Sequence, residues 1–433
     1  MTVGSGGRKL SHDRDRCRIA ERGDVMTRLG RRDMLRMGAL AGVAPLVAGA
    51  DKAPLGPPGE RPVGQVRRYT RLGRTGLEIS DISFGSARLR RGDERLVHQA
   101  LDLGVNYFDT AEGYTGGASE NAMGRALEGR RHDVVLVSKT MARADRDRNS
   151  LMSSLETSLR RLRTDYLDVY FSHAVNDVAR LENPEWHEFA ARAKEQGKVR
   201  FVGMSGHGGR LIECLDYAFD RDMVDVVLIA YNFGQDPSFF SRFTRGLDYV
   251  ARQPDLPRVL AKAQSKDVGV VVMKTLMGAR LNDMRPYETG GTTYAQAAFR
   301  WVLSDEKVHG LVITMHSEEV IDEYVAASGT RGPTSEDLAL LERYARLNGA
   351  TYCRHACTEC EGACPYGVPI PDIMRTRMYA TDYGDPRFAR EEYAKLEVNA
   401  SACLGCTGQP CAGACPHEIP VDAFCAPTHR MLA

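Results

Sequence analysis

The chain has 433 residues, of which 43% are hydrophobic and 27% are charged, and its formal net charge at pH 7 is +1. This length allows two or three domains, and the composition is that of an ordinary soluble globular protein. A charge so close to balance argues against the basic surface that nucleic-acid binding requires, so we expect no nucleic acid among the partners. Eight of the 11 cysteines fall between Cys353 and Cys415 in two tight groups, which indicates metal binding.

The first fifty residues differ from the rest of the chain. An arginine-rich start leads into GRRDMLRMG and then into the weakly apolar run MGALAGVAPLVAGA. This segment resembles a twin-arginine export signal. The resemblance rests on the paired Arg31 and Arg32, on Leu35 and Arg36, and on Ala50 before a plausible cleavage point. The apolar run of about fourteen residues is too short to span a bilayer comfortably, and a buried helix or an uncleaved anchor is the alternative.

Residues 1–50 are therefore expected to be a signal region. The twin-arginine export machinery is then a partner, and the protein is periplasmic or otherwise exported. Residues 51–67, DKAPLGPPGERPVGQVR, are rich in proline and glycine and predict a linker. Residues 68–80, RYTRLGRTGLEIS, alternate about an Arg-Thr-Gly turn and predict a short hairpin ahead of a first strand, DISFG.

Seven further strand-like runs follow, separated by segments such as SLMSSLETSLRRLR and YAQAAFRWVL, whose apolar residues recur at helical spacing. The predicted strands are residues 106–110, 134–139, 166–172, 200–205, 225–231, 269–274 and 310–315. Eight strands alternating with helices predict an α/β fold, a (β/α)8 TIM barrel over residues 68–348, with the hairpin covering its floor. The last predicted helix is residues 335–348, with Ser335 as its N-cap.

Four polar residues stand at the ends of three of these strands. Asp109 and Tyr114 lie in GVNYFDTAEGY, Lys139 ends VVLVSKT, and His173 ends YLDVYFSH. The carboxyl ends of barrel strands are where catalytic residues lie. A tyrosine that acts as an acid at neutral pH needs its phenolate stabilised, and an adjacent Lys139 ammonium would do this.

Asp109 would keep the lysine charged, and His173 could hydrogen-bond a substrate oxygen. The set suits protonation of a carbonyl as hydride arrives. The alternative is that each residue is merely a solvated strand end.

These four residues resemble the Asp, Tyr, Lys and His tetrad of the aldo-keto reductase family. The resemblance covers roughly residues 68 to 330 and is also carried by the flanking segments GYTGGASENAMGRAL and SLETSLRRLRTDYLDVYFSH. It implies an NAD(P)-dependent oxidoreductase that transfers hydride between a nicotinamide cofactor and a carbonyl or alcohol substrate. Asp109, Tyr114, Lys139 and His173 are then the catalytic residues.

The resemblance also implies that NADP or NAD lies across the carboxyl ends of the later strands. The candidate contacts are Ser205, Asn232, Lys274, Leu276, Gly278, His316 and Ser317. Leu228 stands where related reductases often carry a glutamine, and the loop after the last strand lacks the familiar basic residue for a 2′-phosphate. A nicotinamide cofactor is therefore a firmer expectation than a preference for NADP. Alternatively, Ser205 and Asn232 only cap the segments that follow them.

Past Gly349 the sequence becomes rich in cysteine, glycine and proline, and residues 349–433 predict a separate domain. The two cysteine groups are Cys353, Cys357, Cys360 and Cys364 before Pro365, and Cys403, Cys406, Cys411 and Cys415 before Pro416. They resemble a two-cluster bacterial ferredoxin, in which the cysteine before each proline binds the other group's 4Fe-4S cluster. Cys364 would then join the second group and Cys415 the first. The spacing is looser than usual after Cys353 and Cys406, and zinc or disulfides are the rivals.

The whole chain resembles a fused class of aldo-keto reductases with a ferredoxin-like tail and an export signal. Nicotinamide moves two electrons and a cluster moves one, and no flavin motif is visible, so a redox partner protein is a further expectation. An alternative is an electron-transfer or docking protein whose barrel is only a cofactor-sensing scaffold. A third possibility is that the clusters only stabilise the tail.

Overall fold

The computed structural model describes residues 64–208, 210–234, 253, 255–276, 284–288, 291–330, 332–348, 353, 358–381, 385–416 and 418–433. The expected signal region, most of the expected linker, Gly278 and Cys357 lie outside the described residues. Within these ranges, no helix has the length and apolar character needed to cross a membrane.

Eight parallel strands form a closed barrel in which the last strand pairs with the first. They are β3 (Ile82–Gly85), β4 (Tyr107–Asp109), β5 (Val135–Thr140), β6 (Leu167–Ser172), β7 (Val199–Gly206), β8 (Val226–Ala230), β9 (Gly269–Met273) and β10 (Gly310–Thr314). All eight predicted strands and the (β/α)8 fold are confirmed. The register sets Asp109 of β4 between Gly85 and Val137 of the neighbouring strands, so the predicted catalytic edge is shared by adjacent strands.

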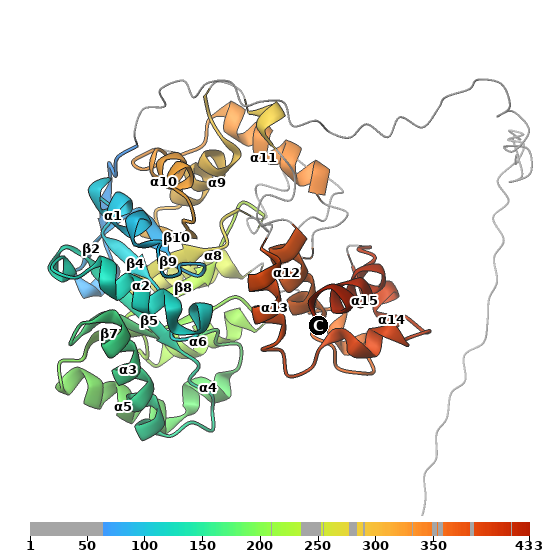
Figure 1. Cartoon of the computed structure of the whole chain (residues 1–433), viewed down its shortest axis with the longest axis horizontal. Helices are drawn as coiled ribbons and strands as arrows, with labels where there is room; N and C mark the ends of the chain where they lie inside the picture. The colour runs from blue at the N-terminus through green and yellow to red at the C-terminus, as the bar shows by residue number, and fades with distance from the viewer. Residues whose placement is uncertain are drawn as a thin grey trace, which may run out of the picture. The chain divides into compact units, whose positions relative to one another are not determined.

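Helices surround the strands, as Figure 1 shows. They are α1 (Glu94–Asp102), α2 (Ala118–Ala126), α3 (Arg148–Leu162), α4 (Val178–Glu182), α5 (Pro184–Glu195), α6 (Leu211–Asp220), α8 (Leu256–Ser265), α9 (Tyr294–Leu303), α10 (Glu318–Val325) and α11 (Ser335–Asn348). The predicted helix at residues 335–348 is confirmed, but its predicted cap is wrong by one residue. Thr334 Oγ1 accepts from the Asp337 amide at 3.1 Å, and Asp337 accepts from the Thr334 amide at 2.8 Å, so these two residues cap each other.

The predicted hairpin covers the floor of the barrel. Strands β1 (Tyr69–Arg71) and β2 (Glu78–Ser80) pair antiparallel, and Leu72, between them, is buried in the barrel interior with Tyr107 and Val135. Gly73 has a φ of +49°, and a Cβ there would lie 2.4 Å from the backbone nitrogen of Gly269. A glycine is required at this turn because of both its conformation and this close approach.

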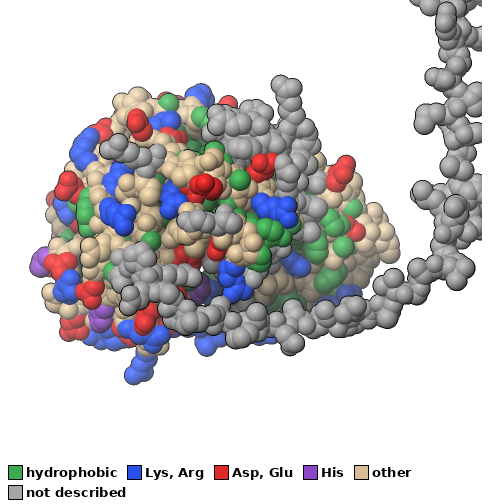
Figure 2. All heavy atoms as spheres, turned by 90° about the horizontal axis from the view of Figure 1, so that it is seen from above, with side chains coloured by type: hydrophobic (Ala, Val, Ile, Leu, Met, Phe, Trp, Pro, Cys, Tyr) green, Lys and Arg blue, Asp and Glu red, His purple; other side chains and the backbone are tan. Residues whose placement is uncertain are grey.

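The barrel strands are buried on both faces, because their inner side chains fill the barrel and their outer ones pack under the helices. Runs such as VVLIA in β8 are therefore continuously apolar rather than alternating. On the face shown in Figure 2, acidic and basic side chains are interspersed, which agrees with the near-neutral net charge.

The described residues from 358 to 433 form helices with a core of their own, which we call the C-terminal module. Its elements are η5 (Glu361–Ala363), α12 (Ile370–Thr381), α13 (Pro386–Tyr393), η6 (Ala400–Leu404), α14 (Pro410–Ala414) and α15 (Val421–Leu432), drawn in red in Figure 1. They share a small core that includes Ile373, Tyr393 and Cys425. No strand occurs among the described residues of this module, so the predicted ferredoxin-like fold is not confirmed.

A buried carboxylate in β6 joins three segments near the barrel floor. Asp168 is 2% exposed and accepts hydrogen bonds from Arg131 at 2.8 Å, from the Leu136 amide at 2.9 Å and from Arg200 at 2.7 Å. Removing this acceptor leaves the buried Leu136 amide without its partner and takes an anion away from the mostly buried Arg131, which is costly.

We expect Asp168→Ala to lower the free energy of unfolding by about 2 to 4 kcal/mol. Urea unfolding followed by circular dichroism measures the change. The control is Asp165→Ala, which removes an exposed carboxylate and is expected to change stability by less than about 0.5 kcal/mol. Equal stability of the two variants would contradict the prediction.

Candidate active site

A buried ion pair lies at the carboxyl ends of two adjacent strands. Lys139 Nζ, on β5, is 2.5 Å from Asp109 Oδ1, on β4, and the two side chains are 1% and 4% exposed. Lys139 Nζ also donates to the Thr110 carbonyl oxygen at 2.6 Å. The carboxylate and the carbonyl therefore fix the ammonium in one place.

Tyr114 and His173 lie next to this pair. Their ring centroids are 5.8 Å apart at an angle of 79°, and Lys139 Nζ is 4.9 Å from the centroid of the Tyr114 ring. The structure thus brings the four predicted catalytic residues together, although they come from three strands and a loop. Their catalytic roles stay predictions.

The loop that carries Tyr114 has an unusual backbone. Thr115, Gly116 and Gly117 all have positive φ, of 49°, 65° and 88°. A larger residue at Gly117 would be strained by the positive φ, and its Cβ would lie 2.5 Å from Arg161 Cζ and displace that side chain. Thr115 Oγ1 donates to the Leu89 carbonyl oxygen at 3.0 Å and ties the loop to the segment after β3. The sequence GYTGG is therefore suited to this turn.

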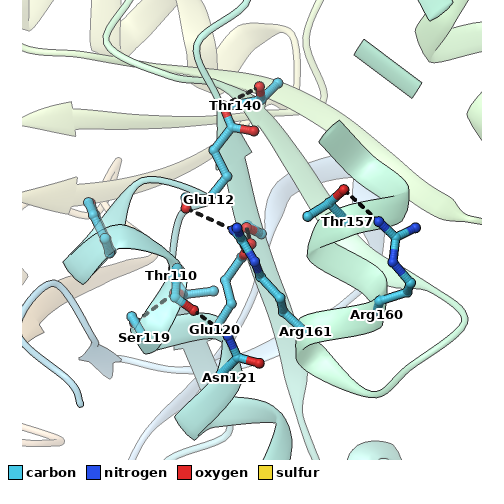
Figure 3. A network of polar contacts seen from close by, with 12 residues as sticks. Thr110, Glu112, Ser119, Glu120, Asn121, Thr140, Thr157, Arg160 and Arg161 are labelled. Carbon is cyan, nitrogen blue, oxygen red and sulfur yellow. Dashed lines mark hydrogen bonds and ion pairs between the residues drawn. The ribbon is translucent and has the colours of Figure 1, made fainter. Parts of the chain in front are cut away.

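Arg161 of α3 holds the same loop in place (Figure 3). It donates to the Glu112 carbonyl oxygen and to Glu120 Oε2, both at 3.1 Å. Glu120 is fully buried and also accepts from Ser138 of β5 at 2.7 Å, while Glu112 Oε1 accepts from Thr140 at 2.6 Å. The Tyr114 loop is therefore clamped to the strand that carries Lys139. The sequence did not predict these contacts. Their only trace in the sequence is Glu120, an acidic residue at a buried position of α2.

Burial dominates the electrostatics of the site. It raises the pKa of Tyr114 well above its ordinary value, and the carboxylates of Asp109 and Glu392 add to the shift. The predicted stabilisation of the phenolate by Lys139 is not visible in this pKa, which burial and the two carboxylates all raise. The Tyr114 phenol is thus protonated and available as a proton donor.

Burial also lowers the pKa of His173 well below its ordinary value, and the charge of Lys139 adds to the shift. The imidazole is therefore neutral near pH 7. Burial lowers the pKa of Lys139 as well, although Asp109 opposes this shift. The site combines a protonated phenol with a neutral imidazole.

The predicted cofactor contacts that the structure describes lie at the carboxyl ends of β7 to β10, but several have internal partners. Ser205 Oγ accepts from the Ala174 amide at 3.0 Å. Asn232 donates to the Lys274 carbonyl oxygen at 3.2 Å and accepts from the Gly234 amide at 3.0 Å. Both side chains hold neighbouring loops in place. This resembles the alternative considered from the sequence, in which Ser205 and Asn232 only cap the segments that follow them.

Of the remaining cofactor candidates, Leu276 is buried, and its carbonyl oxygen accepts from Tyr294 at 2.8 Å. Ser317 caps α10 by accepting from the Val320 amide at 3.3 Å, and His316, just before it, is exposed. Sequence reasoning missed Thr275, whose Oγ1 is buried and has no hydrogen-bond partner among the described residues. An unpaired buried hydroxyl at this edge fits contact with a bound group.

A member of the first cysteine group affects two members of the second. Burial raises the pKa of Cys403 and of Cys411, and in both cases the next contribution is the charge of Cys364. Cys364, Cys403, Cys406, Cys411 and Cys415 are free thiols rather than members of disulfides. No three metal-ligating side chains are arranged to hold an ion in the part of the chain that is described, from which Cys357 is missing.

The sequence profile described as the aldo/keto reductase family matches residues 81–345, which is more than half of the chain. The chain belongs to the aldo/keto reductase family. As a member of this family, the protein is an NAD(P)-dependent oxidoreductase. The match ends within α11, so the C-terminal module lies outside it.

Characterised relatives and a solved structure resemble the same part of the chain. An L-glyceraldehyde 3-phosphate reductase of Escherichia coli O157:H7 is 26% identical over 329 residues, covering 65% of this chain and 93% of the relative. The methylglyoxal reductase YeaE of Escherichia coli K12 is 30% identical over 230 residues, covering 51% and 74%.

The holo form of an aldo-keto reductase from Bacillus halodurans has a TM-score of 0.51 at 22% identity and covers 64% of this chain and 96% of its own, which shows a shared fold. The alternative of a non-enzymatic docking protein finds no support in these comparisons.

The neutral histidines predict a pH dependence of stability. His207, like His173, has a lowered pKa, first because of the charge of Lys274 and then because of burial. The unfolded chain takes up protons on both histidines near pH 6.5 while the folded chain does not, so stability falls as the pH drops below about 6.5.

We expect the double variant His173→Gln and His207→Gln to lose less stability between pH 7.5 and 5.5 than the parent, by about 1 kcal/mol per histidine. Urea unfolding at the two pH values measures this. His132→Gln, at an exposed position, is the control and should keep the parental pH dependence. Identical pH dependence in all three proteins would count against neutral buried histidines.

Proposed function

We propose that the protein is an exported carbonyl reductase of small substrates, using NADP(H) or NAD(H), with a C-terminal module that binds two 4Fe-4S clusters. The observation that supports the reductase reaction most directly is the buried Asp109–Lys139 pair beside the rings of Tyr114 and His173. A lysine fixed by a carboxylate next to a protonated phenol is an arrangement suited to general acid catalysis at a carbonyl oxygen.

Tyr114 and His173 both act on the carbonyl oxygen of the substrate, from different sides. When bound, the nicotinamide cofactor supplies hydride to the carbonyl carbon. Tyr114 Oη donates its proton to the carbonyl oxygen, and the product is an alcohol. Lys139 stabilises the phenolate that Tyr114 leaves, and Asp109 holds the ammonium in position. His173, neutral because of burial and the charge of Lys139, hydrogen-bonds the same oxygen and orients the substrate.

Small carbonyl compounds are the proposed substrate class. The relatives named as reductases of L-glyceraldehyde 3-phosphate and of methylglyoxal support this class, since both names denote short aldehydes or ketoaldehydes. Thr275 Oγ1, a buried hydroxyl without a partner among the described residues, supports a cofactor contact next to Lys274 and Leu276.

The cysteines are the proposed cluster ligands. Cys353, Cys357, Cys360 and Cys415 would hold one 4Fe-4S cluster, and Cys403, Cys406, Cys411 and Cys364 the other. The charge of Cys364, which raises the pKa of both Cys403 and Cys411, supports the crossed assignment. Clusters of this kind exchange single electrons, so a redox partner protein belongs to the proposal. Export by the twin-arginine route, inferred from Arg31 and Arg32, suits a protein that is folded and loaded with metal before transport.

Tyr114→Phe removes the proton donor and keeps the ring. We expect kcat for carbonyl reduction to fall by at least roughly 10²-fold, while the dissociation constant of NADPH stays unchanged. Steady-state kinetics at saturating cofactor, with fluorescence titration of NADPH, measure both quantities. Tyr166→Phe, at the amino end of β6, is the control and should retain full activity. An active Tyr114→Phe enzyme would refute the proposed acid.

Cys364→Ala tests the crossed ligation. We expect the anaerobically purified parent to contain close to eight iron atoms per chain, and the variant to lose the same cluster signal as Cys406→Ala. Iron analysis and electron paramagnetic resonance of the reduced proteins distinguish the two clusters. Cys214→Ala, which alters a buried thiol of the barrel helix α6, should keep the full iron content. If Cys364→Ala matches Cys360→Ala instead, each group binds its own cluster.

A further inference from the structure

An arginine of helix α4 binds the backbone of two loops at the carboxyl end of the barrel. Arg180 Nη2 donates to the His173 carbonyl oxygen at 2.7 Å, and Nη1 donates to the Ala174 carbonyl oxygen at 2.8 Å. Arg180 Nε donates to the Ala142 carbonyl oxygen at 2.9 Å. His173 and Ala174 follow β6, whereas Ala142 follows β5, the strand that carries Lys139. One planar guanidinium therefore joins the loops next to two predicted catalytic residues.

The backbone of His173 is held at both of its polar groups. Its amide donates to the Thr140 carbonyl oxygen at 2.8 Å, and its carbonyl oxygen is bound by Arg180. The next residue, Ala174, has a φ of +53°, a left-handed conformation that is unfavourable for a residue other than glycine. Arg180 holds the Ala174 carbonyl oxygen, and Ser205 Oγ accepts from the Ala174 amide at 3.0 Å. Strained backbone that neighbouring groups hold in place is frequent at functional sites.

The guanidinium of Arg180 has no carboxylate partner. Among the described residues it forms no ion pair, and Asp177, at the start of the same helix, pairs with Arg210 at 3.1 Å instead. Arg180 is half-buried, and carbonyl dipoles compensate such a cation only in part. Its positive charge is therefore not neutralised before it reaches the neighbouring side chains.

The charge of Arg180 bears on the protonation of His173. Burial lowers the pKa of His173 most, and the charges of Lys139 and then of Arg180 lower it further. The charged or titratable groups that face the imidazole are Lys139, Arg180, Lys274, Lys395, Tyr114 and His207. The charges that shift this pKa all belong to cations, so protonation of the imidazole is disfavoured.

Lys395 belongs to the C-terminal module, which contacts the barrel near these loops. Arg88, after β3, pairs with Asp385 at 3.0 Å, and their side chains are only 20% and 17% exposed. Arg143, in the loop after β5, pairs with Glu397 at 3.3 Å. The loop after β5 is therefore in contact with both α4 and the module.

We propose that Arg180 is a positioning residue of the active site: by binding three carbonyl oxygens, it holds the His173 loop next to the strand that carries Lys139. Its charge also opposes protonation of the imidazole. Because most of its donors are used on the backbone, Arg180 acts through His173. This inference rests on the proposed reductase function for the role of His173 at the substrate oxygen.

Arg180→Met is the principal variant, because it keeps much of the side chain and removes the charge and the hydrogen bonds. We expect kcat/KM for methylglyoxal to fall roughly tenfold to a hundredfold, since a small displacement of a positioned group has effects of this size. The dissociation constant of NADPH should change less than roughly twofold. In a His173→Gln background the same substitution should lower kcat/KM by less than roughly threefold, because residues that act as a unit are not additive.

Asn183→Ser is the matched control for loosening the loop after β5. Asn183 Nδ2 donates to the Arg146 carbonyl oxygen at 3.0 Å in that loop, and a serine can still cap α5. Asn183→Ser should keep the parental kinetics. Arg180→Lys keeps the charge but loses the planar fork, so its kcat/KM should lie between those of Arg180→Met and the parent.

Two kinetic results would overturn the proposal. One is a parental kcat/KM in both Arg180→Met and Arg180→Lys. The other is an equal loss from Arg180→Met with and without His173, or a loss of the same size in Asn183→Ser, since either result would assign the effect to general loosening of the loops.

A parent protein that reduces no carbonyl compound would contradict the proposed function without deciding the role of Arg180. Nuclear magnetic resonance titration of the imidazole protons then decides it, with the His173 signal assigned by its absence from His173→Gln. We expect the pKa of His173 to rise towards its ordinary value of about 6.5 in Arg180→Met and to stay parental in Asn183→Ser. An unchanged titration of His173 in Arg180→Met would overturn the proposal.

Discussion

The buried ion pair between Asp109 and Lys139 is the interaction on which the catalytic end of the barrel depends. Removing two charges from water costs several kcal/mol per ion, and their attraction repays this only when the geometry is good and the remaining hydrogen-bonding groups are satisfied. The Thr110 carbonyl satisfies one further proton of Lys139. Asp109 Oδ2, however, is buried without a partner among the described residues. The Asp109–Lys139 pair therefore fixes the position of the ammonium group, at some cost in the free energy of folding.

The same burial sets the protonation of the neighbouring rings. A solvated tyrosine beside a lysine would have a lowered pKa, but burial and the charges of Asp109 and Glu392 all raise the pKa of Tyr114. His173 is neutral for the same reason. Tyr114 is therefore protonated in the free protein. In the proposed reaction, Lys139 stabilises the phenolate as it forms.

The barrel and the tetrad could be predicted from sequence because both follow from short local patterns. Each strand is largely an apolar run, and three of the four predicted catalytic residues stand at or just after the end of one, while Tyr114 lies in the loop after β4. The clamp of Arg161 on Glu112 and Glu120 could not be predicted, since it joins residues about forty to fifty positions apart and leaves no periodic trace. The cap of α11 was misplaced by one residue because Thr334 and Ser335 are equivalent in propensity, and only the reciprocal contact with Asp337 distinguishes them.

The C-terminal module was predicted from cysteine spacing, and that spacing contains no information on where the module docks. The ion pair of Arg88 with Asp385 spans almost three hundred residues and involves ordinary surface residue types. The predicted ferredoxin-like fold came from the resemblance of the cysteine groups, whereas the helices α12 to α15 follow from the segments between and after them.

Asp385 has two tasks, since it caps α13 and anchors that helix to Arg88. Separation of α13 from the barrel would therefore expose a carboxylate that also holds the first turn of the helix. The mostly buried pair of Arg88 and Asp385 thus couples the attachment of the C-terminal module to the charge at the start of α13.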